Sequence, residues 1–237
     1  MPKVLTQIQV DVLEALCAVQ PGMDNLYYFT GGTALSEFHF QHRLSEDIDL
    51  HTHARDDVDA DLHGDAQRLI ATLERNQLSV QIVKEARSFI RFQVADSKGE
   101  QTTLVDLALD HSPGLDSPVP VDGLPVESLR DMAAKKLMAF FERGQDYPKD
   151  AVDLYFLMRV GKFPLEILIN LAAQKSADFD DDDALLYLGA LLLDCRKPAY
   201  LNHMRMLRLL GNLDVDEVGS YLASEGQRLL ERIRPAE

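Results

Sequence analysis

The chain has 237 residues, 46% hydrophobic and 27% charged, a composition typical of folded globular proteins and not of disordered or fibrous ones. Its 39 acidic residues outnumber its 24 basic ones, and the net charge of −15 excludes a protein that binds nucleic acid through overall positive charge. The longest apolar run is too short to cross a bilayer, the first residues do not resemble a signal peptide, and the two cysteines are far apart. We therefore expect a cytoplasmic protein with unpaired, buried thiols.

The first half of the chain alternates predicted helices and strands. Apolar periodicity predicts helices at 4–19, 33–40 and 57–76, and strands at 26–30, 47–51, 79–84, 89–95 and 102–109. This alternation is typical of an α/β unit with a mixed sheet. Residues 1–126 also hold 20 of the acidic residues but only nine basic ones, so most of the negative charge belongs to this half.

A stretch rich in Pro and Gly, residues 111–125, follows and is the expected domain boundary. Beyond it, helical periodicity covers 127–143, 149–160, 164–175, 182–194, 199–210 and 215–232. The predicted fold class is thus α+β: an α/β-type N-terminal unit (1–125), its mixed sheet flanked by helices, and an all-α C-terminal helical bundle (126–237). The acidic run 178–183 reads as a solvated helix cap.

Two aspartates in the strand at 47–51 are the first candidate site residues. Side chains alternate along a strand, so Asp47 and Asp49 point to one face while Ile48 and Leu50 point into the core. Hard oxygen ligands in this pattern suit Mg²⁺, which takes one or two carboxylates and completes its shell with phosphates and water. Just upstream, Gly31 and Gly32 stand at a strand-to-helix junction, where backbone N–H groups can approach a phosphate.

Asp106 supplies a third carboxylate. It lies opposite the apolar face of its own strand and can meet the Asp47 and Asp49 pair across neighbouring strands. Three carboxylates that hold two metal ions, Mg²⁺ with Mn²⁺ as a substitute, are suited to in-line nucleotidyl transfer. One ion would activate the attacking hydroxyl and the other would neutralise the leaving pyrophosphate.

Lys136 is the candidate for binding a triphosphate. It falls on the apolar face of the helix at 127–143, whereas Lys135 falls outside it, and an inward lysine needs an anionic partner. Asp150 and Asp153 could orient Lys136 or the attacking group, or could cap a helix. Arg43 could reach a phosphate or pair with Glu46.

These motifs together resemble the AbiEii/AbiGii toxin family of minimal nucleotidyltransferases, which belongs to the DNA polymerase β-like superfamily. The resemblance is carried by Gly-Gly-Thr-Ala-Leu (31–35), Arg-x-Ser-Glu-Asp-Ile-Asp-Leu (43–50), the lysine helix (134–143) and Lys-Asp-x-x-Asp-Leu (149–154). It covers roughly residues 26–157 and assigns the family's lysine to Lys136. It also implies that Gly31, Gly32 and Thr33 cradle the phosphates of an NTP.

The resemblance further implies an acceptor at the 3′ end of tRNA, a growth-inhibiting toxin and a cognate antitoxin protein. Residues 196–209, with four basic side chains and no acid, are the place where RNA could bind, although they could instead pair with the acidic run. The alternatives are transfer to a small molecule, such as an aminoglycoside, or to a protein hydroxyl, and a catalytically silent nucleotide- or RNA-binding module. Five histidines near Asp47 and Asp49 also allow a zinc site, for which solvated side chains are the simpler explanation.

Overall fold

The structure is a computed structural model that describes residues 4–53 and 62–233. Contacts between residues divide the chain into two units, Met1–Ser128 and Leu129–Glu237. The sheet of the first unit continues to Val126, one residue past the end of the Pro/Gly-rich stretch. Within the described ranges, no helix has the length and apolar character needed to span a membrane.

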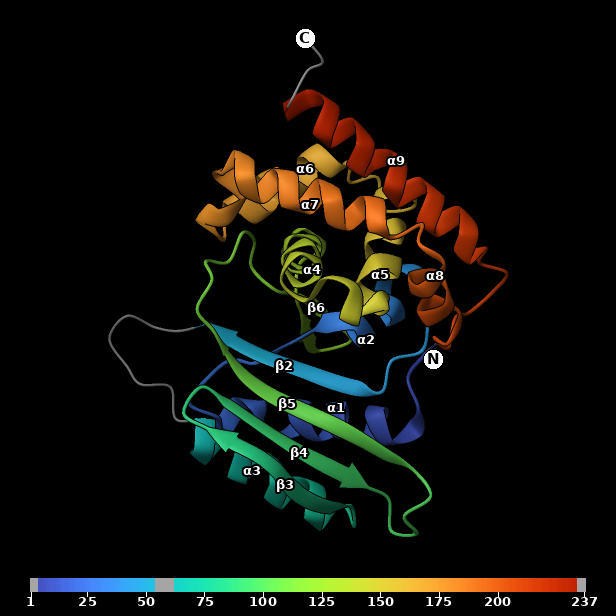
Figure 1. The fold of residues 1–237 in the computed structure, drawn as a ribbon. Helices are drawn as coiled ribbons and strands as arrows, with labels where there is room; N and C mark the ends of the chain where they lie inside the picture. Colours follow the sequence, from blue (N-terminus) through green and yellow to red (C-terminus); the bar gives the residue numbers. More distant parts are fainter. Residues whose placement is uncertain (1–3, 54–61, 234–237) are drawn as a thin grey trace. The chain divides into compact units, whose positions relative to one another are not determined.

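A seven-stranded mixed sheet forms the centre of the first unit (Figure 1). Its strands are β1 (Tyr28–Thr30), β2 (Asp47–His53), β3 (Ser79–Ala86), β4 (Phe89–Ala95), β5 (Thr102–Asp110), β6 (Val119–Val121) and β7 (Leu124–Val126). They lie in the order β3-β4-β5-β2-β1-β7-β6. The pairs β2–β5 and β1–β7 are parallel, and the other neighbours are antiparallel. The mixed sheet predicted from the alternation of elements is therefore confirmed.

Two helices of the first unit cover one face of this sheet, and another comes directly after β1 in the sequence. The helical segments are α1 (Gln7–Val19), η1 (Gln20–Gly22), α2 (Gly31–Leu35), η2 (Ser36–Phe40) and α3 (Leu62–Arg75). The helices α1 and α3 pack on each other and against the sheet (Figure 1). The apolar side chains that alternate along β2, β4 and β5 are buried. The helix α2 begins directly after β1, and together with η2 it occupies the range predicted as one helix at 33–40. The part of the predicted helix 57–76 that precedes residue 62 lies outside the described residues.

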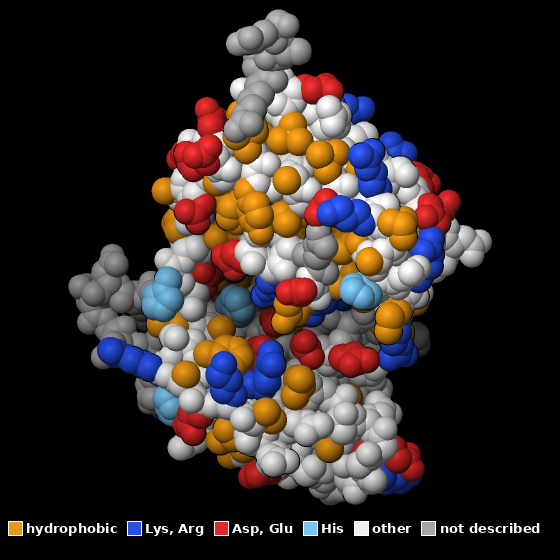
Figure 2. Space-filling view, viewed as in Figure 1, with side chains coloured by type: hydrophobic (Ala, Val, Ile, Leu, Met, Phe, Trp, Pro, Cys, Tyr) orange, Lys and Arg blue, Asp and Glu red, His pale blue; other side chains and the backbone are white. Residues whose placement is uncertain are grey.

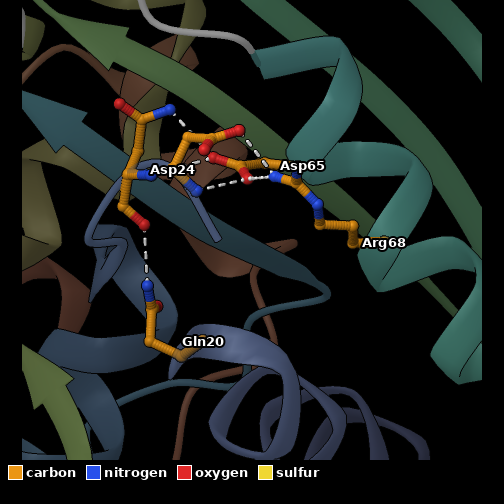
Figure 3. Close-up of polar contacts among 5 residues, drawn as sticks. Gln20, Asp24, Asp65 and Arg68 are labelled. Carbon is orange, nitrogen blue, oxygen red and sulfur yellow. Dashed lines mark hydrogen bonds and ion pairs between the residues drawn. The ribbon is translucent and has the colours of Figure 1, made fainter. Parts of the chain in front are cut away.

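A buried aspartate fastens the loop before β1 to α3. Asp65 is fully buried and accepts hydrogen bonds from the backbone N–H groups of Asp24 and Asn25, at 2.9 and 3.1 Å, and from the Asn25 side chain (Figure 3). Arg68 pairs with both Asp65 and Asp24, and the amide of Gln20 donates to the carbonyl of Asn25. These partners compensate the Asp65 carboxylate for the loss of water, because a buried charge is unfavourable unless it is paired and hydrogen-bonded. The cluster holds the loop that leads into β1.

The sequence led us to expect an irregular Pro/Gly-rich stretch. The structure differs, because this stretch contains the β6–β7 hairpin. Asp122 and Gly123 both have positive φ, of 50° and 85°, which is the backbone of a two-residue hairpin turn. Pro120 lies opposite Pro125, and β6 is the edge of the sheet, where a missing N–H group is tolerated. The prolines masked a hairpin that the Asp-Gly pair could have revealed.

The second unit is helical throughout, as predicted, with α4 (Leu129–Arg143), η3 (Gly144–Asp146), α5 (Pro148–Arg159), α6 (Leu165–Ala173), η4 (Ala177–Asp180), α7 (Asp182–Asp194), α8 (Pro198–Arg205) and α9 (Val215–Ile233). Asp181 caps α7 by accepting from the Ala184 N–H group, so the acidic run is a helix cap. One prediction is wrong: α8 ends at Arg205, not at residue 210. Inside the unit, Lys175 and Asp131 form a buried ion pair at 2.6 Å.

Candidate active site

Asp47 and Asp49 lie on the same face of β2. Between and after them, Ile48 and Leu50 are fully buried in the core, while the two aspartates remain partly exposed. This alternation is the one predicted, and it follows from the two-residue period of a strand. We call the side of the sheet that carries Asp47 and Asp49 the acidic face.

Asp106 joins the acidic face through the register of two strands that are distant in the sequence. The parallel pairing of β2 with β5 sets Asp106 directly beside Asp49, and Ile48 beside Val105. Residues in register on neighbouring strands point to the same side of a sheet, so the Asp106 carboxylate lies on the acidic face. The residue is 5% exposed, the most buried of the three aspartates. The structure therefore brings together the carboxylates that the sequence suggested.

Gly31 makes room for the Asp49 carboxylate. Its φ is +76°, a conformation that side chains rarely adopt, and a Cβ atom built on it would lie 1.8 Å from Oδ2 of Asp49. The absence of a side chain at residue 31 is thus explained by close packing of a carboxylate on the backbone. Any larger residue would have to move Asp49.

Gly32 has a similar relation to Arg43. A Cβ atom on Gly32 would lie 2.1 Å from Nη2 of Arg43, whose side chain is buried against this turn. Thr33 donates from its hydroxyl to the backbone carbonyl of Asp47, which ties the start of α2 to β2. The two glycines therefore leave room for the Asp49 carboxylate and the Arg43 guanidinium. Arg43 lies at the turn where the sequence predicts that phosphates bind.

Arg91 is a site residue that the sequence did not suggest. Its guanidinium forms a two-bond fork with Asp106, with Nε to Oδ1 at 2.7 Å and Nη2 to Oδ2 at 2.6 Å. The pairing of β4 with β5 sets the two residues opposite each other. Hydrogen bonding to Asp106 raises the pKa of Arg91, and the charges of Asp47 and Asp49 add to the effect. The only signal in the sequence was an arginine at a solvent-facing position of a strand.

Thr30 and Glu127 extend the acidic face beyond β2. Thr30 pairs with Asp49 from the other side, and its hydroxyl donates to the buried carboxylate of Glu127. The N–H group of Glu127 donates to the carbonyl of Phe29 at 3.0 Å, which places Glu127 next to the end of β1. Neither residue was a candidate from sequence, because their meeting depends on the β1–β7 pairing.

Lys136, Asp150 and Asp153 form a buried cluster in the second unit. The Lys136 ammonium lies 2.7 Å from Asp153 and 3.6 Å from Asp150, and both carboxylates are fully buried. Arg143 also approaches Asp150, at 3.6 Å. No side-chain cap is formed at the start of α5, so these acids face the lysine instead of capping the helix. Lys136 is buried and Lys135 is not, as the helical periodicity predicts.

The family model described as nucleotidyl transferase AbiEii toxin, type IV toxin–antitoxin system, matches residues 12–219, which is most of the chain. The chain belongs to the AbiEii family. It is thus a nucleotidyltransferase, and the resemblance predicted from residues 26–157 is confirmed over a longer span.

Solved structures agree with this AbiEii assignment at the level of the fold. JHP933 from Helicobacter pylori has a TM-score of 0.53 and 20% identity, covering 96% of this chain and 90% of that one. A candidate nucleotidyltransferase of H. pylori has the same TM-score and 19% identity, covering 98% of this chain and 99% of that one. No curated protein matches the sequence. The predicted α+β fold with C-terminal helices is confirmed.

The acidic face of this AbiEii protein fits a divalent cation in part. Asp47 and Asp49 offer partly exposed, hard oxygen donors of the kind that Mg²⁺ binds. Both oxygens of Asp106 accept hydrogen bonds from Arg91. Among residues 4–53 and 62–233, no three His, Cys, Asp or Glu side chains are grouped so that they could hold a metal ion. The residues therefore fit a cation held by two carboxylates, with the third engaged elsewhere.

Three of the five histidines that lie near Asp47 and Asp49 in the sequence make aromatic or ionic contacts. The ring of Tyr28 lies 6.2 Å from that of His51 and 5.1 Å from that of His53, and its hydroxyl donates to Asp110 at 2.9 Å. His63 faces Glu85 at 3.0 Å. These contacts account for three of the five histidines without a zinc ion.

The basic residues 196–209 do not form one continuous helix. Arg208 lies beyond the end of α8, Arg205 pairs with Asp216 at 2.6 Å, and Lys197 pairs with Asp194 at the same distance. On the face shown in Figure 2, acidic and basic side chains are interspersed over the surface of the helical unit, with hydrophobic ones between them. Part of the local positive charge is thus neutralised within the AbiEii protein itself.

Proposed function

We propose that this AbiEii-family enzyme transfers a nucleotide from an NTP to a hydroxyl acceptor, with Mg²⁺ held on the acidic face by Asp47 and Asp49. One observation carries the proposal: three aspartates from two strands meet on one face of the sheet, beside a glycine turn, in a chain of a nucleotidyltransferase family. Bound Mg²⁺, as one ion or two, supplies a positive charge that stabilises the phosphates and lowers the pKa of the attacking hydroxyl.

The other residues would bind and orient the nucleotide. Arg43, buried at the turn of Gly31 and Gly32, is suited to a phosphate because its guanidinium is planar and permanently charged. The N–H groups of Gly31, Gly32 and Thr33 begin α2 and would face the same phosphates.

Lys136 would neutralise the triphosphate, and Asp150 and Asp153 would hold its ammonium in place. The distances of 3.6 and 2.7 Å support this orienting role, because a lysine held by two buried acids has little rotational freedom. Asp106 would complete the metal site beside the attacking hydroxyl.

Nucleotide transfer tests the proposal directly. The purified chain is incubated with each α-labelled NTP, Mg²⁺ and a pool of total tRNA, protein and small hydroxyl compounds, and the labelled product is identified. Asp49→Asn should lower transfer by at least about 100-fold, since loss of even an outer-shell partner of a metal costs 10–100-fold. Glu100→Gln, which removes an exposed carboxylate in the β4–β5 turn, is the matched control. Full transfer by folded Asp49→Asn protein would refute the proposal.

The acceptor we propose is the 3′ end of tRNA, in the cytoplasm, with growth arrest as the result and a cognate antitoxin as the protein that relieves it. The type IV toxin–antitoxin description of the family supports the antitoxin and the toxic effect. Label in the small-molecule or protein fraction would instead identify an antibiotic-modifying or protein-modifying enzyme. Calorimetric binding of an NTP with no labelled product in any fraction would indicate a silent binding module.

A further inference from the structure

The Arg91–Asp106 pair stands out because it occupies a carboxylate that the proposed reaction needs. Both Asp106 oxygens are used, at 2.7 and 2.6 Å, in the planar fork that arginine forms best with a carboxylate. Asp106 is almost fully buried, whereas about a third of the Arg91 side chain is exposed. The pair thus has one fixed member, on β5, and one member that can reach solvent.

Arg91 also supplies positive charge to the rest of the acidic face. Hydrogen bonding to Asp106 raises the pKa of Arg91 most strongly, and the negative charges of Asp106, Asp47 and Asp49 raise it further, so all three aspartates act on this guanidinium. The ring of Phe89 lies 5.5 Å from the guanidinium carbon and adds a further favourable contact. Arg91 therefore provides, from within the chain, part of the charge that a metal ion would provide.

We propose that Arg91 is a positioning residue that withholds Asp106 from the metal site, so that the nucleotide-free protein binds a divalent cation through Asp47 and Asp49 alone. This inference rests on the proposed function of the acidic face. A cation that used Asp106 would have to share its oxygens with the fork and approach the guanidinium charge. Release of Arg91 from Asp106 then leaves the oxygens of the third carboxylate available to a cation, and the freed guanidinium is available to phosphates of the substrate.

A different result is expected if the Arg91–Asp106 pair has only a structural role. If the fork only joins β4 to β5, its loss lowers stability and changes cation affinity only by removing one positive charge. That charge effect should be at least as large when Asp106 is already neutral, because Arg91 then repels the cation without compensation. The two explanations therefore differ in how the effect of Arg91 depends on Asp106.

The test is Mn²⁺ affinity of the full-length, nucleotide-free protein, measured by electron paramagnetic resonance of free Mn²⁺. The variants are Arg91→Gln, Asp106→Asn, the double variant and Arg91→Lys, which keeps the charge but cannot form the fork. We expect Arg91→Gln to bind Mn²⁺ at least tenfold more tightly than the wild type, with a clearly smaller gain when Asp106 is already Asn. Arg91→Lys should increase Mn²⁺ affinity by a smaller factor that also depends on Asp106. This variant replaces Arg91→Gln in the test if Arg91→Gln does not fold.

Controls separate this inference from the proposed function. Arg75→Gln removes an exposed positive charge from α3, on the opposite face of the sheet, and should leave Mn²⁺ affinity unchanged. Asp49→Asn should abolish Mn²⁺ binding in the wild-type background. Unchanged binding in Asp49→Asn would contradict the proposed metal site. The role of Arg91 would be overturned if Arg91→Gln did not bind Mn²⁺ more tightly than the wild type. It would also be overturned if Arg91→Gln increased Mn²⁺ affinity equally or more in the Asp106→Asn background.

Discussion

Replacement of Gly31 by alanine tests how closely the turn and the acidic face depend on each other. The added Cβ atom would lie 1.8 Å from Oδ2 of Asp49 and 2.6 Å from its Cγ, at a residue with φ of +76°. Two effects combine: a backbone penalty of about 1–2 kcal/mol for an L residue in this conformation, and displacement of the carboxylate. We expect Gly31→Ala to be destabilised by more than the backbone penalty and to lose nucleotide transfer.

Gly99 provides the matched control for the backbone penalty. Its φ is +70°, nearly that of Gly31, but nothing lies within 4 Å of a Cβ atom built on it. Gly99→Ala should therefore lower the free energy of unfolding by about 1–2 kcal/mol and keep full nucleotide transfer. Each kcal/mol corresponds to a fall of roughly 2–4 °C in melting temperature. The difference between the two variants measures the displacement of Asp49.

Urea denaturation followed by circular dichroism gives the two stability changes, and the labelled-NTP assay gives transfer. The design also separates strain from steric displacement, because the two variants share the same backbone penalty. If Gly31→Ala matched Gly99→Ala both in stability and in transfer, the close packing of Asp49 on this turn would be refuted.

Three further predictions concern buried polar groups and thiols. Asp65→Ala leaves two backbone N–H groups without their acceptor and should lower the free energy of unfolding by at least about 2 kcal/mol in urea titration; an unchanged midpoint would contradict this. Lys175→Met removes the ammonium that lies 2.6 Å from the buried Asp131 carboxylate and should lower the free energy of unfolding by about 3–5 kcal/mol, most of which the double variant with Asp131→Leu should recover. Burial raises the pKa of both thiols, most strongly that of Cys195, so little thiolate forms at pH 8. Half-buried Cys17 should react first with a disulfide reagent, and faster labelling of Cys195 in folded protein would oppose this explanation.

Much of the secondary structure could be predicted, since it depends on local periodicity. The strand at 89–95 and the helix at 182–194 have the predicted bounds, and Asp47 and Asp49 alternate with core residues as expected. The errors arose where two local signals competed. Prolines concealed the hairpin around Asp122 and Gly123, and continued apolar and basic residues suggested a helix to residue 210 where α8 ends at Arg205.

The candidate site required information that no local pattern contains. Asp106 meets Asp49 only because β2 and β5 pair in parallel with one particular register, and a shift by one residue would turn Asp106 to the other face of the sheet. Arg91 meets Asp106 through a second register, between β4 and β5.

The amino-acid sequence was therefore sufficient for the family and for the alternation of Asp47 and Asp49 with core residues, because residue type, charge and periodicity are properties of short segments. Pairing of distant strands is a property of the folded chain, and it alone decided that an arginine shares the face with three aspartates. That is why the family and its acidic motif could be inferred first, while the cation that the protein itself supplies to Asp106 became visible only in the tertiary structure.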